Sequence, residues 1–480
     1  MWLGDEQVLH DGRWVVAYRS GGGDLYGGTA GIGLVLSQVA AATGEPEVAN
    51  AARGALRHAV RWVERTRPPH SLFSGSAGVA CALVDAAESL DDPSLTDAAL
   101  DLALAAAEAP PTSNDLISGR AGSVLALLHL GREMDRPEVT EAAETLGERL
   151  VDAAEHVPAA GLAWPSDGEP GESPLCGLAH GASGPVLALT ELASVRGRGR
   201  LLDVAVAGTA YERAWYSAEH QNWPDLRELD REAMTRGEEP GWPAFWCHGS
   251  LGIGLARLRL LELTGRSVFE AEATVALDSA LSQVRAAAAL DAEAVGEQGD
   301  FSLCHGLGAA IELLLEGARV LRRPALSRAA RRAGDLAMEL TEGAAGPWPS
   351  GVHRGGENPS LMLGLAGTAL TFLRLANPQV ASPLRAYAVS VVTRRVIVQL
   401  RAPVDPATLA GQAERLCAFA PGAEVERISP RGRVLLRLPV DADLASALDA
   451  LGAADDVEYA EADVIDTAQG SEGAAPDLDS

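Results

Sequence analysis

Two cysteines in this sequence each stand directly before a His-Gly pair. Cys247 begins one Cys-His-Gly group and Cys304 begins the other. Thiolates and imidazoles are ligands that zinc prefers, and three protein ligands with a fourth position open are typical of catalytic zinc. We therefore predict one Zn²⁺ bound by Cys247, Cys304 and His305. The alternative is that these are small core residues at crowded helix starts, because free cysteine is commonly buried.

Both Cys-His-Gly groups lie in copies of a repeated motif, apolar-apolar-x-Gly-x-small-Gly, which occurs at intervals of roughly 45 to 70 residues. The seven copies begin at Leu25, Leu72, Leu116, Leu178, Trp246, Leu303 and Leu361. The sixth copy has Ala309 where the second glycine would fall. Each motif precedes a stretch with helical spacing of apolar residues, and an amphipathic stretch rich in Ala, Arg and Glu follows it.

A repeated helix pair cannot bury its apolar face alone, so the repeats are expected to stack. Seven helix-pair repeats are enough to close a ring. We predict an all-α α/α toroid, with inner helices that begin at the glycine motifs and outer helices around them. The motif loops would converge at one mouth and bring the zinc ligands together there. Cys81, Cys176 and Cys417 have no partner in phase and are predicted to be buried thiols.

The pattern changes near Arg394. Alternating apolar residues and two helical stretches follow in the order βαββαβ, which predicts a small α+β ferredoxin-like domain. The predicted organisation is a lead-in over 1–23, the toroid over 24–377, a linker over 378–393, the small domain over 394–466 and a disordered tail over 467–480.

Composition excludes several classes of function. The chain has 480 residues and a formal charge of -27, which opposes binding to nucleic acid and to anionic membranes. All 39 basic residues are arginines. The absence of lysine excludes a P-loop lysine, a kinase-type nucleotide lysine and a Schiff-base lysine. No apolar run is long enough to span a membrane and no secretory signal is present, so we expect a cytoplasmic enzyme.

Residues 24–378 resemble the lanthionine synthetase C-like cyclases. WCHGSLGIG from Trp246 and LCHGLG from Leu303 are similar to the two zinc motifs of that family. GLAHGASG from Gly177 is similar to its Gly-x-x-His-Gly-x-x-Gly motif, and further likeness lies in NWPDLR from Asn222 and in the last repeat. The family often has an arginine shortly before the first zinc cysteine, whereas GWPAFWC has none.

The resemblance implies an α/α toroid with one zinc, which activates a peptide cysteine for addition to dehydroalanine or dehydrobutyrine. By the same resemblance His180 is the catalytic acid/base. Asp115 would orient an imidazole or the substrate cysteine, with a helix N-cap as its alternative role. His248 is either a second proton source, a group that supports a zinc ligand, or structural.

The chemistry fits these residue types. Zinc lowers the pKa of a bound thiol, so that it binds as the thiolate at neutral pH. Its addition to the β-carbon of an unsaturated residue generates an enolate, which needs a proton at the α-carbon, and a nearby imidazole can supply it.

Several functions agree with these residues. A ring-forming cyclase would act on a precursor peptide dehydrated by a separate dehydratase. The same chemistry would also add a small thiol such as glutathione to dehydrated proteins. A third function is that of a zinc-stabilised scaffold without catalysis. A fourth is that of an α/α-toroid carbohydrate enzyme, and the Cys/Cys/His set counts against it.

The C-terminal region resembles propeptide-like inhibitors of subtilisin-type proteases. The likeness lies in VIVQLR and in the closing VEYAEADVID. It implies a subtilisin-like protease as a partner of this region, and the alternative is an accessory domain that only docks on the toroid.

Overall fold

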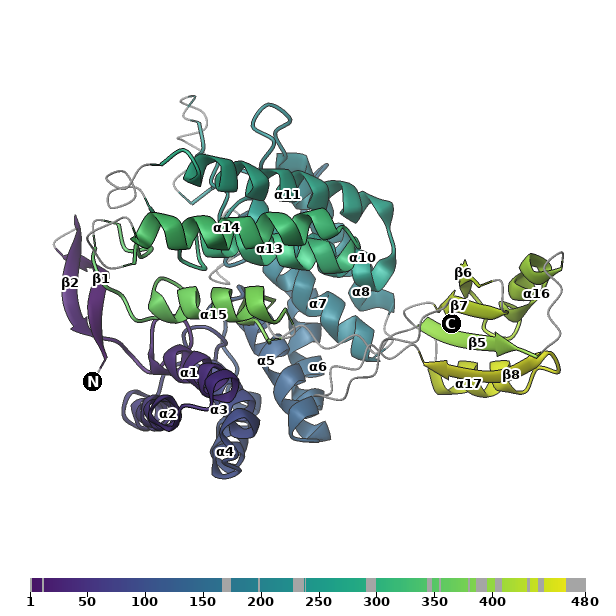
Figure 1. Cartoon of the computed structure of the whole chain (residues 1–480), viewed down its shortest axis with the longest axis horizontal. Coiled ribbons are helices and arrows are strands. Elements are labelled where there is room, and N and C mark those ends of the chain that lie inside the picture. The colour runs from purple at the N-terminus through teal and green to yellow at the C-terminus, as the bar shows by residue number, and fades with distance from the viewer. Residues whose placement is uncertain are drawn as a thin grey trace. The chain divides into compact units, whose positions relative to one another are not determined.

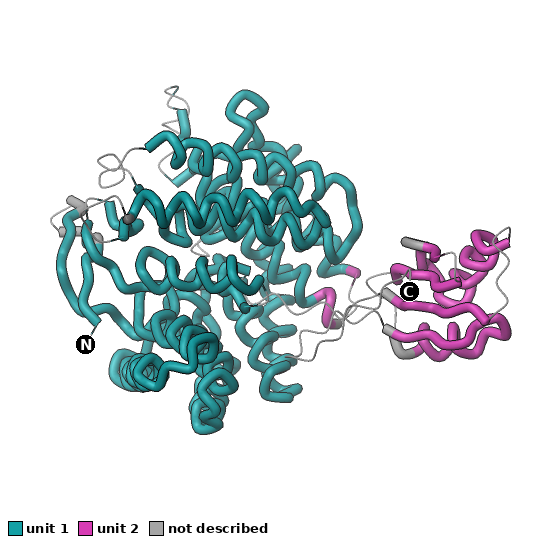
Figure 2. Tube along the Cα trace, in the orientation of Figure 1, with its two compact units in different colours: residues 1–192, 200–388 teal, residues 193–199, 389–480 magenta. Residues whose placement is uncertain are grey.

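The computed structural model describes residues 2–10, 13–165, 174–196, 199–227, 237, 239–290, 299–342, 348–353, 355–378, 380–385, 395–401, 408–429, 432–438 and 444–462. The chain forms two compact units (Figure 2). The large unit contains residues 1–192 and 200–388, and the small unit contains residues 389–480 together with 193–199. The predicted tail over 467–480 lies outside the described residues.

Each of the seven motifs precedes a helix of the large unit, as predicted (Figure 1). These inner helices are α1 (Thr29–Thr43), α3 (Ser76–Leu90), α5 (Arg120–Glu133), α7 (Ser183–Arg196), α10 (Ser250–Thr264), α13 (Leu307–Val320) and α15 (Leu365–Ala376). The helices between them are α2 (Pro46–Thr66), α4 (Ser94–Glu108), α6 (Pro137–Asp152), α8 (Gly199–Trp215), α11 (Ser267–Ala287) and α14 (Pro324–Glu342). Most of α10 is buried, whereas α2 buries one alanine- and leucine-lined stripe, which is the difference expected between inner and outer helices.

The prediction of seven complete pairs is wrong for the last pair within the described part of the chain. No outer helix follows α15 there, and the chain instead continues through Pro378 to the short 3₁₀ helix η1 (Pro383–Arg385). The Arg374 guanidinium donates hydrogen bonds to the carbonyl oxygens of Pro378 and Val380. The Trp246 indole donates to the carbonyl oxygen of Leu384 at 3.2 Å. The described residues between 378 and 385 therefore pack against the large unit.

The motif loops are joined into a closed ring by backbone hydrogen bonds, one from each loop to the next. The donor and acceptor residues are Tyr26 to Phe73, Phe73 to Ile117, Leu116 to Ala179, Ala179 to Cys247, Trp246 to Cys304, Cys304 to Met362 and Met362 to Tyr26. The last of these bonds returns to the first loop. Helix α1 also packs against both α3 and α15, so the first and last inner helices are neighbours.

The second glycine of the motif allows each inner helix to approach its own loop closely. A Cβ atom at Gly78 would lie 1.7 Å from the carbonyl oxygen of Leu72, the first residue of the same motif. In the sixth motif the close contact falls one residue earlier, at Gly308. A Cβ atom there would lie 2.9 Å from the carbonyl oxygens of Phe301 and Ser302. Its deviation at Ala309 is therefore a shift of the close contact and not its loss.

The residues predicted as a lead-in form a β-hairpin. Strands β1 (Leu3–His10) and β2 (Arg13–Ser20) pair antiparallel, with Leu3 opposite Ser20. The backbone N–H of Asp5 donates to the carbonyl oxygen of Glu357 at 2.9 Å, which attaches the hairpin beside the last repeat. A second, smaller hairpin joins β3 (Glu155–Val157) and β4 (Gly161–Ala163).

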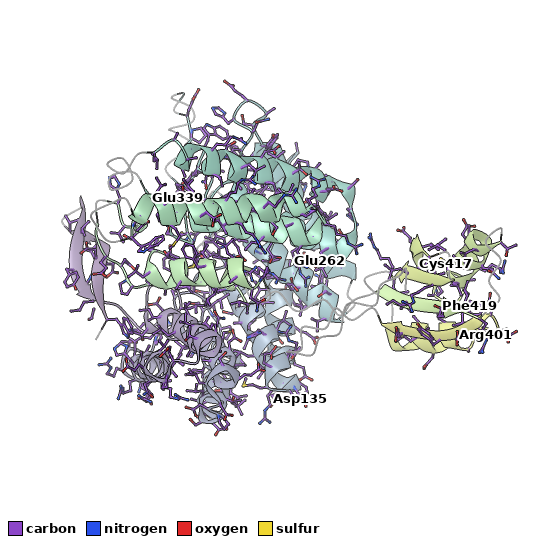
Figure 3. The ribbon with its side chains drawn as sticks, in the orientation of Figure 1. Asp135, Glu262, Glu339, Arg401, Cys417 and Phe419 are labelled. Atoms are coloured by element: carbon purple, nitrogen blue, oxygen red, sulfur yellow. The ribbon has the colours of Figure 1, made fainter. Side chains whose placement is uncertain are left out.

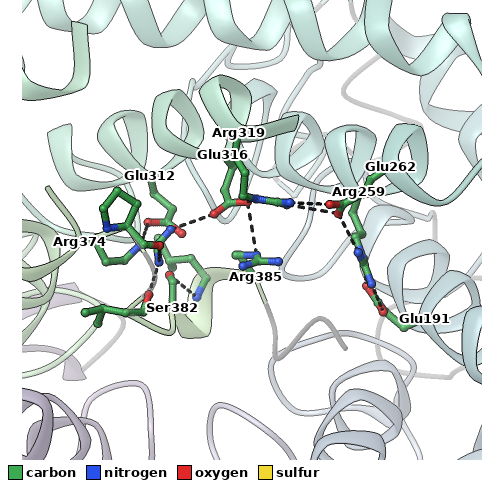
Figure 4. A network of polar contacts seen from close by, with 12 residues as sticks. Glu191, Arg259, Glu262, Glu312, Glu316, Arg319, Arg374, Ser382 and Arg385 are labelled. Atoms are coloured by element: carbon green, nitrogen blue, oxygen red, sulfur yellow. Dashed lines mark hydrogen bonds and ion pairs between the residues drawn. The ribbon is translucent and has the colours of Figure 1, made fainter. Parts of the chain in front are cut away.

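Buried ion pairs join the inner helices further along their length (Figure 4). The Arg259 guanidinium on α10 binds Glu191 on α7 and Glu262 on its own helix. Glu262 also binds Arg319 of α13 at 2.5 Å, and a third arginine, Arg374 of α15, binds carboxylates on α13. The pairs thus link four of the seven inner helices. Breaking one partner of such a buried pair typically costs about 3 to 5 kcal/mol.

The small unit contains β5 (Arg395–Leu400), α16 (Leu409–Leu416), β6 (Glu424–Ile428), β7 (Arg433–Arg437), α17 (Leu444–Gly452) and β8 (Val457–Ala462). Its antiparallel sheet has the order β6-β7-β5-β8, which agrees with the expected ferredoxin-like βαββαβ pattern. Alternate residues such as Val396, Val398 and Val434 form its core with the two helices. None of the helices described in either unit combines the length and apolarity needed to cross a membrane.

Candidate metal centre and active site

The ring of loops surrounds an open cavity of about 580 Å³. Its lining includes Tyr26, Cys247 and Cys304, each of which is the second residue of its repeat motif. The third residue of three motifs is a histidine that also lines the cavity. Those histidines are His180, His248 and His305. The predicted site residues other than Asp115 thus line one cavity, because they occupy two equivalent positions in consecutive repeats.

The two thiols of the predicted metal centre influence each other's protonation. A hydrogen bond with Cys304, followed by the nearby His305, lowers the pKa of Cys247 to about 7 in spite of burial. The same bond and burial raise the pKa of Cys304 well above its usual value. Cys247 is therefore the thiol of the pair that loses its proton more easily. The Tyr26 hydroxyl donates a hydrogen bond to the Cys304 sulfur at 3.0 Å, from a residue 278 positions away in the chain.

His305 is held by a carboxylate that the sequence analysis missed. Its Nδ1 lies 2.6 Å from Oδ2 of Asp300, while the other carboxylate oxygen accepts the backbone N–H of Ser302. Burial opposes the protonation of His305, but the Asp300 contacts outweigh it and raise its pKa. This contact leaves Nε2 as the ring nitrogen available to a metal, and carboxylate support of this kind is common for histidine ligands.

The residues fit a zinc ion by their chemistry, although they do not form a finished metal site. Over the described residues, no three His, Cys, Asp or Glu side chains have the geometry to hold a metal ion. Cys247, Cys304 and the oriented His305 nevertheless supply two interacting thiols and one imidazole on one cavity wall. This donor set suits zinc, and metal binding would require both thiols to lose their protons.

His180 and Asp115 form a second pair in the same region. His180 Nδ1 lies 2.8 Å from Asp115 Oδ2, and 36% of the His180 side chain is exposed. Asp115 is buried, and its other oxygen accepts the backbone N–H of Ser118 at 2.7 Å. Asp115 therefore takes only one of the two roles considered, the contact with an imidazole, because the N-cap residue of α5 is Gly119 and no side chain caps that helix. It accepts from a motif-loop amide and orients an imidazole that faces the cavity.

His248 has a different environment. Its side chain is 1% exposed, and its ring stacks on that of His180 with centroids 5.8 Å apart. Neither ring nitrogen has a hydrogen-bond partner among the described residues. Burial lowers its pKa to about 4, so the ring is neutral near pH 7.

Four residues near the centre were missed by the sequence analysis: Glu6, Tyr26, Arg227 and Asp300. Glu6 comes from β1 and Arg227 from the NWPDLR segment, and both line the cavity. Arg227 binds Asp225 at 2.6 Å and places a guanidinium on the cavity wall. The GWPAFWC segment before Cys247 contains no arginine, whereas the NWPDLR segment supplies one to the cavity wall.

All five cysteines are free thiols. Cys81 and Cys176 are fully buried, as predicted, and burial raises both pKa values. Cys417 lies in the small unit (Figure 3) and is only partly buried, so the prediction of a buried thiol is wrong there. Cys417 is the C-cap residue of the short helix α16 and packs against the small unit's core.

The fold and site define a class of protein, an α/α toroid with a Cys/Cys/His group and a His–Asp pair at its mouth. The family model described as lanthionine synthetase C-like protein matches residues 20–387. The chain belongs to this family.

Comparison with solved structures finds this fold in nisin cyclase. Nisin cyclase matches with a TM-score of 0.54 and 16% identity, over 77% of this chain and 93% of its own. Lin0763 of Listeria innocua matches with a TM-score of 0.40 and 12% identity, over 63% of this chain and 84% of its own. An α-1,6-mannanase of Salegentibacter sp. matches with a TM-score of 0.39 and 15% identity, over 65% and 88%. No curated protein sequence matches significantly.

Proposed function

We propose that this protein is a zinc-dependent lanthipeptide cyclase. It would add peptide cysteine thiols to dehydroalanine or dehydrobutyrine and so form (methyl)lanthionine thioether rings. The observation that carries the proposal is that the interacting thiols of Cys247 and Cys304 share one cavity with His180, which Asp115 orients. Family membership supports the same reaction.

Cys247, Cys304 and Nε2 of His305 would hold the zinc, and Asp300 would keep the imidazole in the orientation required. Bound zinc would supply a Lewis acid that holds the substrate cysteine as its thiolate at neutral pH. The fourth coordination position would be left to the substrate.

His180 would move the proton. The substrate thiol loses its proton, its sulfur forms a bond to the β-carbon of the dehydro residue, and the double-bond electrons move into an enolate. His180, oriented by Asp115 and exposed to the cavity, returns one proton to the α-carbon. The sum is an addition of S–H across C=C with nothing released. We assign this role to His180 and not to His248, because 36% of the His180 side chain is exposed and only 1% of the His248 side chain is.

The dehydrated precursor peptide would come from a separate dehydratase, because the chain contains no lysine for a P-loop or kinase-type nucleotide site. For the small unit we retain the proposal that it binds a subtilisin-like protease. Its four-stranded sheet carries helices α16 and α17 that share one core with alternate strand residues.

The experiment is incubation of the purified protein with a peptide that contains one cysteine and one dehydroalanine. Ring closure leaves the mass unchanged, so thiol alkylation before mass spectrometry counts the cysteines that have reacted. We expect about one zinc per chain and a product that no longer alkylates. Cys304→Ala should lose both, whereas Cys417→Ala, in the other unit, should keep both.

Two competing functions give different results in this assay. A protein that adds small thiols would consume dehydroalanine only when glutathione is present, with a gain of one glutathione in mass. A scaffold without catalysis would bind zinc and yield no thioether. Full zinc content in Cys304→Ala would contradict the proposed metal centre.

A further inference from the structure

We propose that the outer edge of strand β2 binds an extended segment of the peptide substrate as an added strand and leads it to the cavity. The identity of the occupant rests on the proposed function. The place of binding rests on the hairpin geometry. Strand β1 lies between β2 and the helices, so β2 forms the outer edge of this two-stranded sheet (Figure 1).

The direction of the β2 backbone groups follows from Asp5 on β1. The Asp5 N–H donates to Glu357, and its carbonyl oxygen accepts from the Asn358 side chain at 2.7 Å. Both groups therefore point away from β2, so Asp5 and its partner Tyr18 form a non-hydrogen-bonded pair of the antiparallel ladder. In such a pair the N–H and C=O of Tyr18 also point outward. Because the pattern alternates, those of Val16 do the same.

These outward groups have no backbone partner among the described residues. Their side chains are also open, since Tyr18 is 65% exposed and Val16 is 39% exposed. Proteins usually protect an edge of this kind with charge, proline or a covering element. At Val16 and Tyr18 the edge instead presents apolar and aromatic side chains, which favours strand addition.

The hairpin is continuous with the candidate active site. β2 ends at Ser20, and within six residues the chain reaches Tyr26, whose hydroxyl binds the Cys304 sulfur. On the opposite face of the hairpin from Tyr18, Glu6 lines the cavity. A strand added beside β2 would thus continue along Gly21–Gly23 to the thiols. At ~3.3 Å per residue, a peptide needs roughly ten residues to reach from the metal centre to Val16.

This geometry favours a peptide over other occupants. Strand addition is carried mainly by backbone hydrogen bonds, so it suits a substrate whose side chains change as rings form. A small thiol cannot reach the edge and the cavity together. A second copy of this chain, paired β2 to β2, would occupy the edge and block the route, and the experiment separates that outcome.

The experiment compares two synthetic probes on the full-length protein. The long probe has 20 residues with its cysteine and dehydroalanine at the centre, and the short probe keeps only the six central residues. Val16→Pro removes one outward N–H without breaking a β1–β2 bond, and its ring obstructs the edge. Val16→Ala removes the side chain and keeps the N–H.

We expect Val16→Pro to raise the KM of the long probe roughly tenfold with kcat unchanged, and to leave the short probe unaffected. Val16→Ala should stay close to wild type on both. If wild type cyclises neither probe, the proposed function fails. If it cyclises both with equal KM, or if Val16→Pro and Val16→Ala behave alike, the edge proposal is wrong.

Amide hydrogen exchange tests the edge in the wild-type protein, where no variant has to fold. Binding of the long probe should slow exchange at Val16 and Tyr18. Val15 and Ala17, whose N–H groups point towards β1, provide the internal control. Binding without added protection at Val16 and Tyr18 would overturn the proposal. Protection that rises with protein concentration alone would assign the edge to a second copy and overturn it as well.

Discussion

Three consecutive repeats place a histidine at the third motif position, and the three rings have different surroundings. His305 contacts Asp300, His180 contacts Asp115, and His248 is enclosed. Asp300 lies just before the motif that contains His305. Asp115 lies just before the motif of the third repeat, whereas His180 belongs to the fourth. The same residue type at the same motif position therefore has three different environments.

His180 is the residue whose loss separates metal binding from proton transfer. His180→Ala should keep about one zinc per chain but lower cyclisation by about 10²-fold, the usual effect of removing a positioned acid or base. Zinc content measures metal binding, and the alkylation assay at saturating peptide measures the rate of cyclisation. His248→Asn should change the rate much less. Equal losses in the two variants would argue against His180 as the proton donor.

Asp300 is expected to strengthen zinc binding through His305. Asp300→Asn keeps the size of the side chain but removes the charge that orients the imidazole. Zinc affinity, measured by competition with a chelator, should fall by about 10- to 100-fold, as is usual for such supporting carboxylates. Asp152→Asn is the control, because the Asp152 side chain is 78% exposed. An unchanged affinity in Asp300→Asn would remove Asp300 from the metal centre.

The three proposed zinc ligands could be predicted from sequence because Cys-His-Gly recurs in phase with the repeat. Tyr26, Asp300 and Arg227 could not. Tyr26 reaches Cys304 only because the ring brings the first and sixth loops close, and no local pattern reports such a contact. Asp300 precedes its motif by a few residues, where a carboxylate is just as often a turn residue.

At the scale of the helices, close contact between each inner helix and its own loop depends on the second motif glycine. Gly78→Ala should lower the free energy of unfolding by about 1 to 3 kcal/mol, because the new Cβ would lie 1.7 Å from the Leu72 carbonyl oxygen. Denaturant unfolding measures the change.

Gly54→Ala is the matched control, since no heavy atom lies within 4 Å of a Cβ at this position in α2. There we expect a gain of about 0.5 to 1 kcal/mol from helix propensity. If both variants have the same stability, the close approach has no energetic role.

The ion pairs between inner helices should make stability depend on acid pH. Burial opposes the charged form of Glu262, but Arg259 and Arg319 outweigh it and lower its pKa to about 2. The pKa of Glu262 is lower in the folded protein than its unfolded value near 4.5, so its charged form stabilises the fold above pH 4.5. This contribution is lost as the pH falls towards 2.

Glu262→Gln should therefore lower the free energy of unfolding by about 3 kcal/mol at pH 7 and by little near pH 2. The measurement is denaturant unfolding of both proteins across this pH range. Exposed Glu339, on α14, provides the control as Glu339→Gln (Figure 3). A difference between wild type and Glu262→Gln that does not shrink in acid would exclude this carboxylate as its source.

The inner helices could be predicted because glycine motif and helical spacing agree at each start. The N-terminal hairpin could not be derived from alternation, because LGDEQVLH mixes polar and apolar residues on both faces of β1. The available signal was the Asp-Gly pair at 11–12 in the sequence, a pair favoured in two-residue hairpin turns. Strand propensity alone does not report that the hairpin docks on residues 356–358.

At the scale of the whole molecule, the last inner helix of a closed ring needs a segment packed on its outer side, as the other inner helices have. The sequence pattern predicted a seventh pair, but proline at 378 and 383 does not favour a further helix. In the described residues the segment 378–385 supplies carbonyl oxygens to Arg374 and Trp246 instead. The large unit accordingly extends to residue 388, beyond the predicted boundary at 377.

Two truncations test whether residues 378–388 belong to the toroid. A chain ending at 388 should keep its zinc and its helical signal, since it contains the whole large unit. A chain ending at 377 leaves the buried Arg374 and Trp246 without their carbonyl partners, and each unsatisfied donor costs about 1 to 3 kcal/mol.

The shorter chain should therefore unfold at a clearly lower denaturant concentration and hold zinc less tightly, because Trp246 directly precedes Cys247. Circular dichroism and zinc content of both chains measure this. Equal stability of the two chains would show that residues 378–388 do not stabilise the toroid. Loss of zinc in both chains would show that the toroid depends on the small unit. We expect the full-length chain and the chain 1–388 to have similar stability and zinc content, and the chain 1–377 to have clearly lower values of both.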